Sequence, residues 1–463
     1  MNSIPDSVPL CIDLDGTLTS VDTLHEALLS LARQAPAALL LLPLRRRHGI
    51  TSVRNDVEAR ARLDTTHLPF NQPLLVWLRA ERAKGRRLVL LSAGDSRIAA
   101  QIAGQLGLFD QIVDRARVIG QFGERGFDYA GSKPAGEAMW RAARRAIVVG
   151  SGTQAARVGR IAEVERVFGC AASGPRVWIK AMRLHQWVKN MLIFVPALLA
   201  HKILEPAIFL ECVAAFLAFG LCASSVYLVN DLLDLGADRQ HPRKHKRPFA
   251  SGELSARSGL FGACVLLGGS ALLAGWVGGR FAAVLGGYYA LTWAYSLRLK
   301  RAALVDVMTL AGLYTIRIIA GAAATGIAPS FWLLAFSVFI FLSLGFVKRY
   351  TELDDSREAG KADSAGRGYQ ATDLPLLMTL GVTSGYCTVV VMALYINSTD
   401  SQALYRHNQP LWLVCPLLLY WISRIWLLTT RNQMLDDPVV FALRDRLSLV
   451  VLGLLGLIML ISI

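Results

Sequence analysis

Hydrophobic and polar positions are distributed differently in the two parts of this chain. Before residue 170, short apolar runs alternate with charged stretches, as in a soluble domain that mixes strands and helices. Beyond Trp187, apolar stretches recur that are long enough to cross the ~30 Å hydrocarbon layer of a membrane. We therefore predict a soluble α/β domain with a Rossmann-like sheet over 1–170, followed by an all-α polytopic membrane bundle over 176–463.

The second part contains about nine apolar stretches of the length that a transmembrane helix needs. The first is short and carries Lys189. The predicted spans are 187–204, 207–229, 259–277, 281–297, 302–324, 331–347, 374–396, 411–428 and 447–463.

Basic residues gather in the loops after the second, fourth, sixth and eighth spans, whereas the opposite loops are nearly uncharged. Cytoplasmic loops of membrane proteins are enriched in Lys and Arg. An odd number of spans with the N-terminus inside brings all the basic loops to one face. We therefore expect a multi-pass protein of the inner (cytoplasmic) membrane, with its N-terminal domain and active site in the cytoplasm. Met1 to Leu10 lacks the pattern of a cleavable signal peptide.

Composition narrows the class of function. Hydrophobic residues make up 54% of the 463 residues and mean hydropathy is +0.41, which is too apolar for a soluble protein of this length. The net charge is +15, but the basic residues lie at the ends of apolar stretches and are not interleaved with aromatics, so we expect no nucleic-acid partner. The seven cysteines are scattered without CxxC pairs, which predicts neither a disulfide framework nor a zinc site.

An acidic motif lies at the end of the second predicted span. Asp231, Asp234 and Asp238 follow Asn230 at i, i+3 and i+7 spacing, which places the three acids on one face of a helix. Such carboxylates repel one another unless a cation neutralises them, and all-oxygen ligands favour Mg²⁺, which commonly joins carboxylates to substrate phosphates. The pattern therefore predicts a Mg²⁺ site. A solvated loop is the alternative, but it leaves the spacing of the acids unexplained.

Further charged and polar residues surround this motif in the sequence. The basic run that follows could hold phosphate oxygens directly; it contains Arg243, Lys244, Lys246 and Arg247. The ends of the fourth and sixth spans lie at the same predicted depth as the acids; they carry Tyr295, Lys300, Lys348, Arg349, Tyr350 and Glu352.

Two ionisable residues lie inside the fifth span, where they are expensive unless they face protein or water. Asp306 and Arg317 are separated by about three helical turns, so both can face one cavity. A structural salt-linked network is the alternative. Arg424 stands alone inside the eighth span, and we expect its role to be structural.

At these residues the sequence resembles the UbiA superfamily of membrane prenyltransferases, over about 176–463. The most specific mark is NDxxDxxxD at the end of the second helix. The second aspartate-rich motif of the superfamily, normally after the sixth helix, is poorly matched. That place holds Lys348, Arg349, Tyr350 and Glu352, with Asp354 and Asp355 off the usual spacing. A site with fewer acids and more bases suits more anionic substrates than a prenyl diphosphate and an aromatic ring.

Segments 183–190, 243–252 and 348–353 resemble one branch of the superfamily, the decaprenyl-phosphate phosphoribosyltransferases. The resemblance implies transfer of a 5-phosphoribosyl group from phosphoribosyl diphosphate to a polyprenyl (decaprenyl) phosphate, which supplies lipid-linked arabinose donors for cell-wall synthesis. It implies that Asp231, Asp234 and Asp238 hold Mg²⁺ on the pyrophosphate, oriented by Asn230. It also implies that the basic residues bind phosphate oxygens, namely Lys189, Lys244, Lys246 and Arg247. The donor is implied by the resemblance alone.

The N-terminal part carries a second candidate site. Asp13 and Asp15 lie in a DxDGT sequence that follows an apolar run, where the first acid is well placed as a nucleophile and the second as an acid/base. Ser92 ends another apolar run, and a third apolar run lies at 146–150. These residues resemble the haloacid dehalogenase-like (HAD-like) phosphatases, in which Asp13 is the nucleophile, Asp15 the acid/base and Ser92 a phosphate ligand.

The later motifs of that phosphatase family are degraded. The family needs a lysine that neutralises the phosphoaspartate and further acids on a later loop, but here Ser132 and Gly136 replace the acids and Lys133 is the nearest lysine. Two acids alone hold Mg²⁺ weakly. We therefore expect a domain that has lost most or all of its activity; an intact domain would remove the 5-phosphate from the lipid-linked product.

Two other functions compete with phosphoribosyl transfer. A UbiA-type prenyltransferase with an aromatic acceptor would consume prenyl diphosphate, and the weak second acidic motif argues against it. A transporter or channel with a regulatory soluble domain would show internal repeats and broken helices. The sequence shows no convincing repeat, and its acids cluster at one end of the bundle.

Overall fold

The structure, a computed structural model, describes residues 8–35, 50–61, 63–93, 97–132, 137–169, 174–358, 367–434 and 437–462. Its contacts divide the chain into two compact units. One unit combines Met1–Met182 with Tyr227–Ala263, and the other combines Arg183–Val226 with Cys264–Ile463. The acidic motif therefore belongs to the same unit as the N-terminal domain. The predicted boundary between 170 and 176 stays a prediction.

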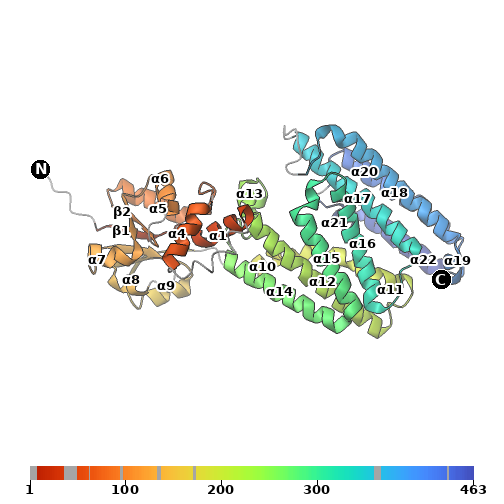
Figure 1. Ribbon diagram of the computed structural model, residues 1–463, viewed down its shortest axis with the longest axis horizontal. Coiled ribbons are helices and arrows are strands. Elements are labelled where there is room, and N and C mark those ends of the chain that lie inside the picture. The colour runs from red at the N-terminus through yellow and green to blue at the C-terminus, as the bar shows by residue number, and fades with distance from the viewer. Residues whose placement is uncertain are drawn as a thin grey trace. The chain divides into compact units, whose positions relative to one another are not determined.

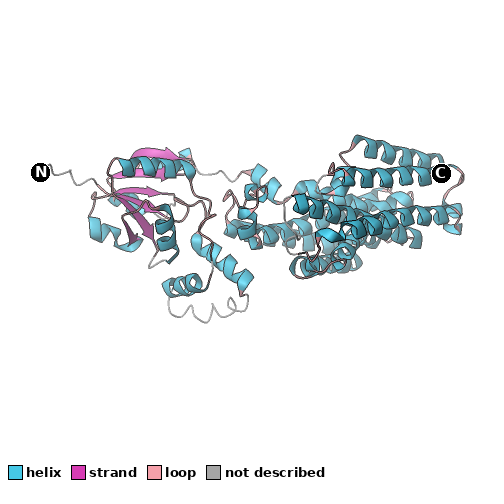
Figure 2. Cartoon of the chain, turned by 90° about the horizontal axis from the view of Figure 1, so that it is seen from above, coloured by secondary structure: helices cyan, strands magenta, loops and turns pink. Residues whose placement is uncertain are grey.

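A parallel β-sheet organises the N-terminal domain (Figures 1 and 2). Its strands lie in the order β3-β2-β1-β4-β5-β6, so the order reverses between β1 and β4. Ligands of such open sheets bind outside the carboxyl ends of the strands at this reversal. The strands are β1 (Leu10–Asp13), β2 (Leu88–Ser92), β3 (Gln111–Asp114), β4 (Asp128–Gly131), β5 (Arg145–Val149) and β6 (Glu163–Phe168).

Helices cover both faces of the sheet, as the nearly continuous apolar strands require. One hydrophobic core joins Ile12 and Leu90 to the first four helices, and the other joins Cys11 and Val89 to the next three. The helices of the domain are α1 (Thr23–Gln34), α4 (Ile50–Arg60), α5 (Gln72–Ala83), α6 (Arg97–Leu106), α7 (Val118–Phe122), α8 (Glu137–Ala142), α9 (Gly152–Val158) and α10 (Pro175–Ala181), with a 3₁₀ turn η2 (Arg115–Arg117). The predicted α/β architecture is confirmed.

Local sequence explains where several of these helices begin. Asp22 caps α1, because its carboxylate accepts hydrogen bonds from the backbone N–H groups of Leu24 and His25. Asn71 caps α5 in the same way, and Pro73 stands in the first turn, where its missing N–H costs nothing.

The remainder of the chain is helical. Among the described residues, six helical segments are long and apolar enough to cross a membrane, so the protein is a multi-pass membrane protein. They are α12 (Pro206–Leu233), α14 (Ala256–Val277), α16 (Val305–Thr325), α17 (Phe331–Glu358), α18 (Leu374–Ile396) with η7 (Ala371–Asp373), and α20 (Val414–Thr430) with η8 (Pro410–Leu413). The other elements are η4 (Leu184–Phe194), α11 (Val195–Leu199), α13 (Leu235–Gln240), η5 (Lys244–Lys246), α15 (Gly279–Leu297), η6 (Leu299–Arg301), α19 (Thr399–Leu404), α21 (Pro438–Ala442) and α22 (Arg446–Ser462).

Of the nine predicted spans, six correspond to membrane-length helices in the described residues, and the other three are not confirmed. The first predicted span, 187–204, is not one long α-helix: it consists of η4 and the short α11, whose first turn contains Pro196. The fourth and ninth correspond to α15 and to the 17-residue α22, which lie outside the six. Sequence alone predicts all nine because an apolar stretch does not show whether it folds as one long helix, as 187–204 does not, or as a shorter one, as α22 does.

Candidate active site

The acidic motif lies at a break between two helices of the first unit. α12 ends at Leu233, Asp234 has a backbone ψ of 7°, and α13 starts at Leu235. Asp231 therefore lies on α12 and Asp238 on α13. The helix that was predicted to carry all three acids is therefore interrupted at Asp234.

One arginine joins the two outer acids. Arg247 Nη1 lies 3.1 Å from Asp231 Oδ1 and 2.7 Å from Asp238 Oδ2. Both carboxylates are buried, with 3% of each residue exposed. Two buried carboxylates need a nearby cation, and here the guanidinium supplies it. Asp231 and Asp238 thus converge on one positively charged position, and their role as metal ligands stays a prediction.

The donor set of this position fits Mg²⁺. Its ligands would be the carboxylate oxygens of Asp231 and Asp238, since these oxygens already contact a single cationic nitrogen. Mg²⁺ usually takes only one or two carboxylates and completes its shell with water and substrate phosphates. Within the described residues, no three His, Cys, Asp or Glu side chains gather closely enough to form a metal site by themselves. Asp234 is therefore the weakest of the three predicted metal ligands.

The basic run continues from this position into the 3₁₀ turn η5. Arg243, Lys244 and Lys246 are exposed, so their charged groups are available to an anion. The Lys180 ammonium donates to the Lys246 carbonyl oxygen at 2.6 Å and holds the backbone of this turn. Asn230, at the end of α12, is half-buried next to Asp231. These residues satisfy the geometric part of the prediction: exposed bases follow two converged acids.

The second unit holds a separate charge network around Arg349, on α17. Its guanidinium forms ion pairs with Asp306 and Glu352 and donates a 2.9 Å hydrogen bond to the Tyr295 hydroxyl. Asp306 also accepts from the Tyr369 hydroxyl, and Arg367 lies 2.6 Å from Glu352. Arg349 is only 2% exposed. Its charge is thus matched by acids of the protein, and the predicted substrate contact of Arg349 finds no geometric support.

The two ionisable residues of the fifth predicted span do not pair with each other. Asp306 is held by Arg349, whereas Arg317 donates to the Asn190 side-chain oxygen at 2.9 Å, to the Tyr288 hydroxyl at 3.1 Å and to a backbone carbonyl. Asp306 thus lies in a salt-linked network with Arg349, in agreement with the structural alternative, whereas Arg317 lies in a separate hydrogen-bond network. Arg424 pairs with Asp445 through both carboxylate oxygens, at 2.6 and 3.1 Å, as a structural role predicts.

Lys189 and Asp437 form a buried ion pair in the second unit. Burial raises the pKa of Asp437, but Lys189 and Lys348 more than compensate, so the pKa lies below the ordinary value of 3.8. Lys189, predicted to bind phosphate, thus has an acid partner. The other predicted ligands of this unit, Lys300 and Lys348, are half-buried, and Tyr350 packs edge-on against Trp426.

The candidate phosphatase site lies at the carboxyl end of β1. Asp13 ends β1, and the Tyr129 hydroxyl, from the adjacent β4, donates a hydrogen bond to Asp13 Oδ2. Arg115 Nη1 lies 3.4 Å from the same oxygen, and Arg115 Nη2 donates to the Tyr129 hydroxyl at 3.2 Å. Burial and the neighbouring Asp13 carboxylate raise the pKa of Tyr129 above its ordinary value, so its hydroxyl stays protonated and acts as a donor. The predicted nucleophile is therefore engaged on one oxygen by two donors.

Asp15 is tied to helix α1 and to α4. Its Oδ1 accepts from the backbone N–H of Thr23 at 2.8 Å, and its Oδ2 lies 3.3 Å from Arg54 Nη2. Burial lowers the pKa of Arg54, but the neighbouring Asp15 and Glu58 carboxylates raise it by more. The pKa therefore lies above its ordinary value, and the guanidinium stays charged. Ser92, the predicted phosphate ligand, is buried at the end of β2, which is adjacent to β1. Lys133 and Gly136 lie outside the described residues.

Sequence reasoning missed Tyr129 and Arg115, although they contact the predicted nucleophile. Tyr129 stands in a buried strand, where its hydroxyl must find a partner, and this requirement was a usable signal. It also missed Glu26. This acid lies on the buried stripe of α1 together with Thr23, Ala27 and Leu31. An acid on the buried stripe of an amphipathic helix signals a buried cation partner.

Comparisons with known proteins cover the part of the chain that contains the acidic motif. The sequence pattern of the UbiA prenyltransferase family matches residues 191–457, which include all six candidate membrane spans. The "Uncharacterized protein y4nM" of Sinorhizobium fredii is 37% identical over 459 residues, or 95% of this chain and 88% of that protein. The decaprenyl-phosphate phosphoribosyltransferase of Mycobacterium tuberculosis is 32% identical over 277 residues, or 58% of this chain and 88% of that enzyme. The solved structure of a UbiA homolog from Archaeoglobus fulgidus, bound to GPP and Mg²⁺, covers 61% of this chain and 99% of its own, with a TM-score of 0.48 and 15% identity.

Proposed function

Because this chain belongs to the UbiA prenyltransferase family, we propose that it is a Mg²⁺-dependent membrane transferase whose donor is phosphoribosyl diphosphate and whose acceptor is a polyprenyl phosphate such as decaprenyl phosphate. The observation that carries the proposal is the convergence of Asp231 and Asp238 on one cationic position, directly before exposed bases. The 32% identity to a decaprenyl-phosphate phosphoribosyltransferase supports this choice of substrates.

The charge balance of the second unit supports anionic substrates over an aromatic acceptor. The resemblance to the UbiA superfamily implies an aspartate-rich second motif at the place of residues 348–355. Here Glu352 is engaged by Arg349 and Arg367, and Asp306 by Arg349, so these acids already have cationic partners. Lys300 and Lys348 lie in the same unit and add positive charge that would suit anionic substrates.

The proposed reaction forms a bond between a phosphate oxygen of the lipid and the anomeric carbon of ribose, while the bond from that carbon to pyrophosphate breaks. Bound Mg²⁺ would neutralise charge on the leaving pyrophosphate. Asp231 and Asp238 would hold the ion, and Arg247, which now pairs with both acids, would turn to the phosphate oxygens together with Arg243, Lys244 and Lys246. We place this site and the N-terminal domain on the cytoplasmic face of the inner membrane, because the site itself contains the basic run Arg243 to Arg247 and cytoplasmic loops are enriched in Lys and Arg.

Product analysis tests the proposal. Detergent-purified full-length protein receives Mg²⁺ and polyprenyl phosphate with phosphoribosyl diphosphate in one tube, and prenyl diphosphate with 4-hydroxybenzoate in the other. We expect a lipid-linked phosphoribose in the first tube, and we expect Asp231→Asn to reduce its rate at least 100-fold, since Mg²⁺ loses one of two carboxylates. Asp400→Asn, which removes an exposed carboxylate of α19, is the control and should retain the wild-type rate. Prenylated benzoate instead would assign the chain to aromatic prenyl transfer.

A further inference from the structure

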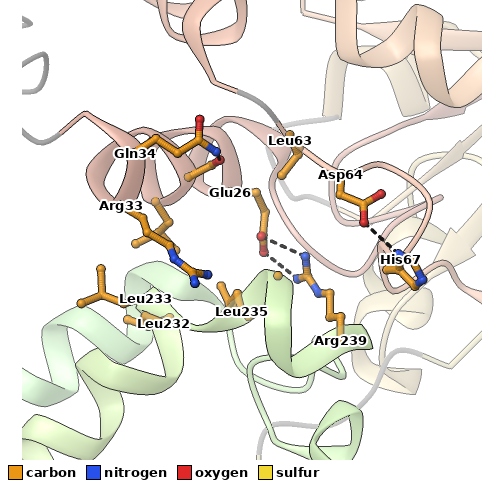
Figure 3. Close-up of a pocket in the computed structure, with 13 residues that line it drawn as sticks. Glu26, Arg33, Gln34, Leu63, Asp64, His67, Leu232, Leu233, Leu235 and Arg239 are labelled. Carbon is orange, nitrogen blue, oxygen red and sulfur yellow. Dashed lines mark hydrogen bonds and ion pairs between the residues drawn. The ribbon is translucent and has the colours of Figure 1, made fainter. Parts of the chain in front are cut away.

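A cavity of about 200 Å³ separates helix α1 of the N-terminal domain from the end of α12 and from α13, within the first unit (Figure 3). Leucines line much of it, whereas one wall is a pair of charged residues that face each other. In this pair Glu26 comes from α1 and Arg239 comes from α13. The acidic motif and the N-terminal domain therefore meet at a charged contact beside this cavity.

The contact between Glu26 and Arg239 is bidentate. Arg239 Nη1 donates to Glu26 Oε2 at 3.0 Å, and Nη2 donates to Glu26 Oε1 at 2.8 Å. Each side chain is only 5% exposed. A paired fork of this kind fixes orientation as well as position, and burial protects it from screening by salt. Glu26 thus holds both terminal nitrogens of Arg239, whose Nε donates to the Ala250 carbonyl oxygen at 3.3 Å.

Two more contacts hold the same segment. The Gln240 side chain donates to Asp64 at 3.1 Å. Gly252 has a φ of +78°, and a Cβ at this position would lie 2.4 Å from the Ser20 hydroxyl oxygen, so its backbone closely approaches the N-terminal domain. Residues 239–252 are therefore attached at both ends, with the bases Arg243 to Arg247 between the attachments.

Helix α1 is itself a fixed point. Ala27 and Leu31 are buried in the core of the N-terminal domain, and the Thr23 N–H is held by Asp15. Arg239 directly follows Asp238 on the six-residue helix α13. A displacement of Arg239 therefore displaces Asp238, and with it the position where Asp238 meets Arg247.

We propose that Glu26 is a positioning residue for the transferase site: through Arg239 it holds α13 so that Asp238 stays converged with Asp231. The inference deepens the proposed function and rests on it for its kinetic consequences. The N-terminal domain then contributes to transfer as a structural part of the donor site, whether or not it retains chemistry of its own.

The test uses full-length Glu26→Gln, Arg239→Gln and the double variant. Glu81→Gln is the matched control, because Glu81 is also buried in this unit and paired with Lys84 and Arg86, far along the chain from the acidic motif. Two quantities are measured: hydrogen exchange of segment 235–254, and kcat and KM for phosphoribosyl diphosphate. We expect faster exchange in 235–254 in both single variants, and about 10- to 100-fold lower kcat/KM, the usual effect of a small misplacement. The kcat/KM of the double variant should be no lower than that of the more impaired single variant, because both substitutions remove the same ion pair.

The outcomes separate this inference from the proposed function. Unchanged exchange in 235–254 in Glu26→Gln overturns the inference, whatever happens to activity. Exchange that rises throughout the N-terminal domain, and equally in Glu81→Gln, also overturns it, because the effect is then general destabilisation. If wild-type protein makes no lipid-linked phosphoribose, the proposed function has failed, and the exchange data alone decide on Glu26.

Discussion

Charged residues in this protein mostly have specific partners, including those that lie inside the bundle. Arg349 shares its guanidinium between two acids, and Lys189 is matched by Asp437. Ionisable residues are costly inside a membrane, so the sequence predicted that such residues face protein or water. It did not identify partners that are distant along the chain, such as Asp437, which lies 248 residues from Lys189.

The pair of Lys189 and Asp437 gives a pH-dependent prediction. The folded-state pKa of Asp437 lies below 3.8, so its charge stabilises the fold above the unfolded-state pKa, and this contribution disappears as pH falls through the folded-state value. Asp437→Asn removes the charge, but the asparagine can still cap α21 as Asp437 does. We expect a loss of about 3 kcal/mol at pH 7. Thermal unfolding in detergent should show this difference shrinking at pH values below 3.8.

A difference between wild-type protein and Asp437→Asn that stays the same from pH 7 to the acid limit would contradict the ion pair. Asp400→Asn serves again as the control, because the carboxylate of Asp400 on α19 is exposed. Its unfolding curve should follow that of wild-type protein at every pH.

At the scale of elements, periodicity and apolar length predicted the strands and most long helices. The runs ending at Asp13, at Ser92 and near Gly150 became β1, β2 and β5, and six predicted spans became membrane-length helices. The break at Asp234 was not predictable from these signals. No proline lies at the break, Gly236 follows it only inside α13, and a local hydrophobic pattern does not record tertiary contacts.

Close packing of elements is visible at the glycines of α16. A Cβ at Gly321 would lie 2.0 Å from the backbone oxygen of Ile193, whereas a Cβ at Gly312, on the same helix, would meet nothing within 4 Å. Small residues allow backbones to approach in this way inside membrane bundles. Gly321 is therefore required for the contact between α16 and η4.

We expect Gly321→Ala to lower stability by about 1–3 kcal/mol through overpacking. Gly312→Ala should be neutral or slightly stabilising, since alanine is the better helix former. Thermal unfolding of the two variants in the same detergent measures both effects. Equal stability of the two variants would show that η4 does not approach α16 this closely.

At the scale of the whole molecule, the sequence predicted two parts and their order along the chain. The compact units do not follow that order, because Tyr227–Ala263 joins the N-terminal domain. Sequence reasoning assigned this segment to the membrane part on the basis of its motif, and that assignment agrees with the family match. The additional attachment depends on Glu26 and Arg239, and no local pattern connects residues so far apart.

For the N-terminal domain we expect little or no phosphatase activity in the full-length protein. Asp13 Oδ2 is occupied by the Tyr129 hydroxyl and lies beside Arg115, which together reduce the nucleophilicity of the carboxylate. With a generic aryl phosphate and Mg²⁺, turnover by wild-type protein should not exceed that of Asp13→Asn. Turnover that is clear in wild-type protein and lost in Asp13→Asn would instead establish a working phosphatase and a haloacid dehalogenase-like reaction.

The link between Glu26 and Arg239 also has a consequence for biosynthesis. The two residues are 213 positions apart in the chain. At about 5–20 residues per second, roughly 10–40 s of translation separate them. The strands β2 to β6 of the N-terminal domain are themselves synthesised within this interval, and Glu26 has no Arg239 to pair with until α13 has been made. The acidic motif therefore reaches its final form only after α12 and α13 have been synthesised and Arg239 has paired with Glu26 of α1.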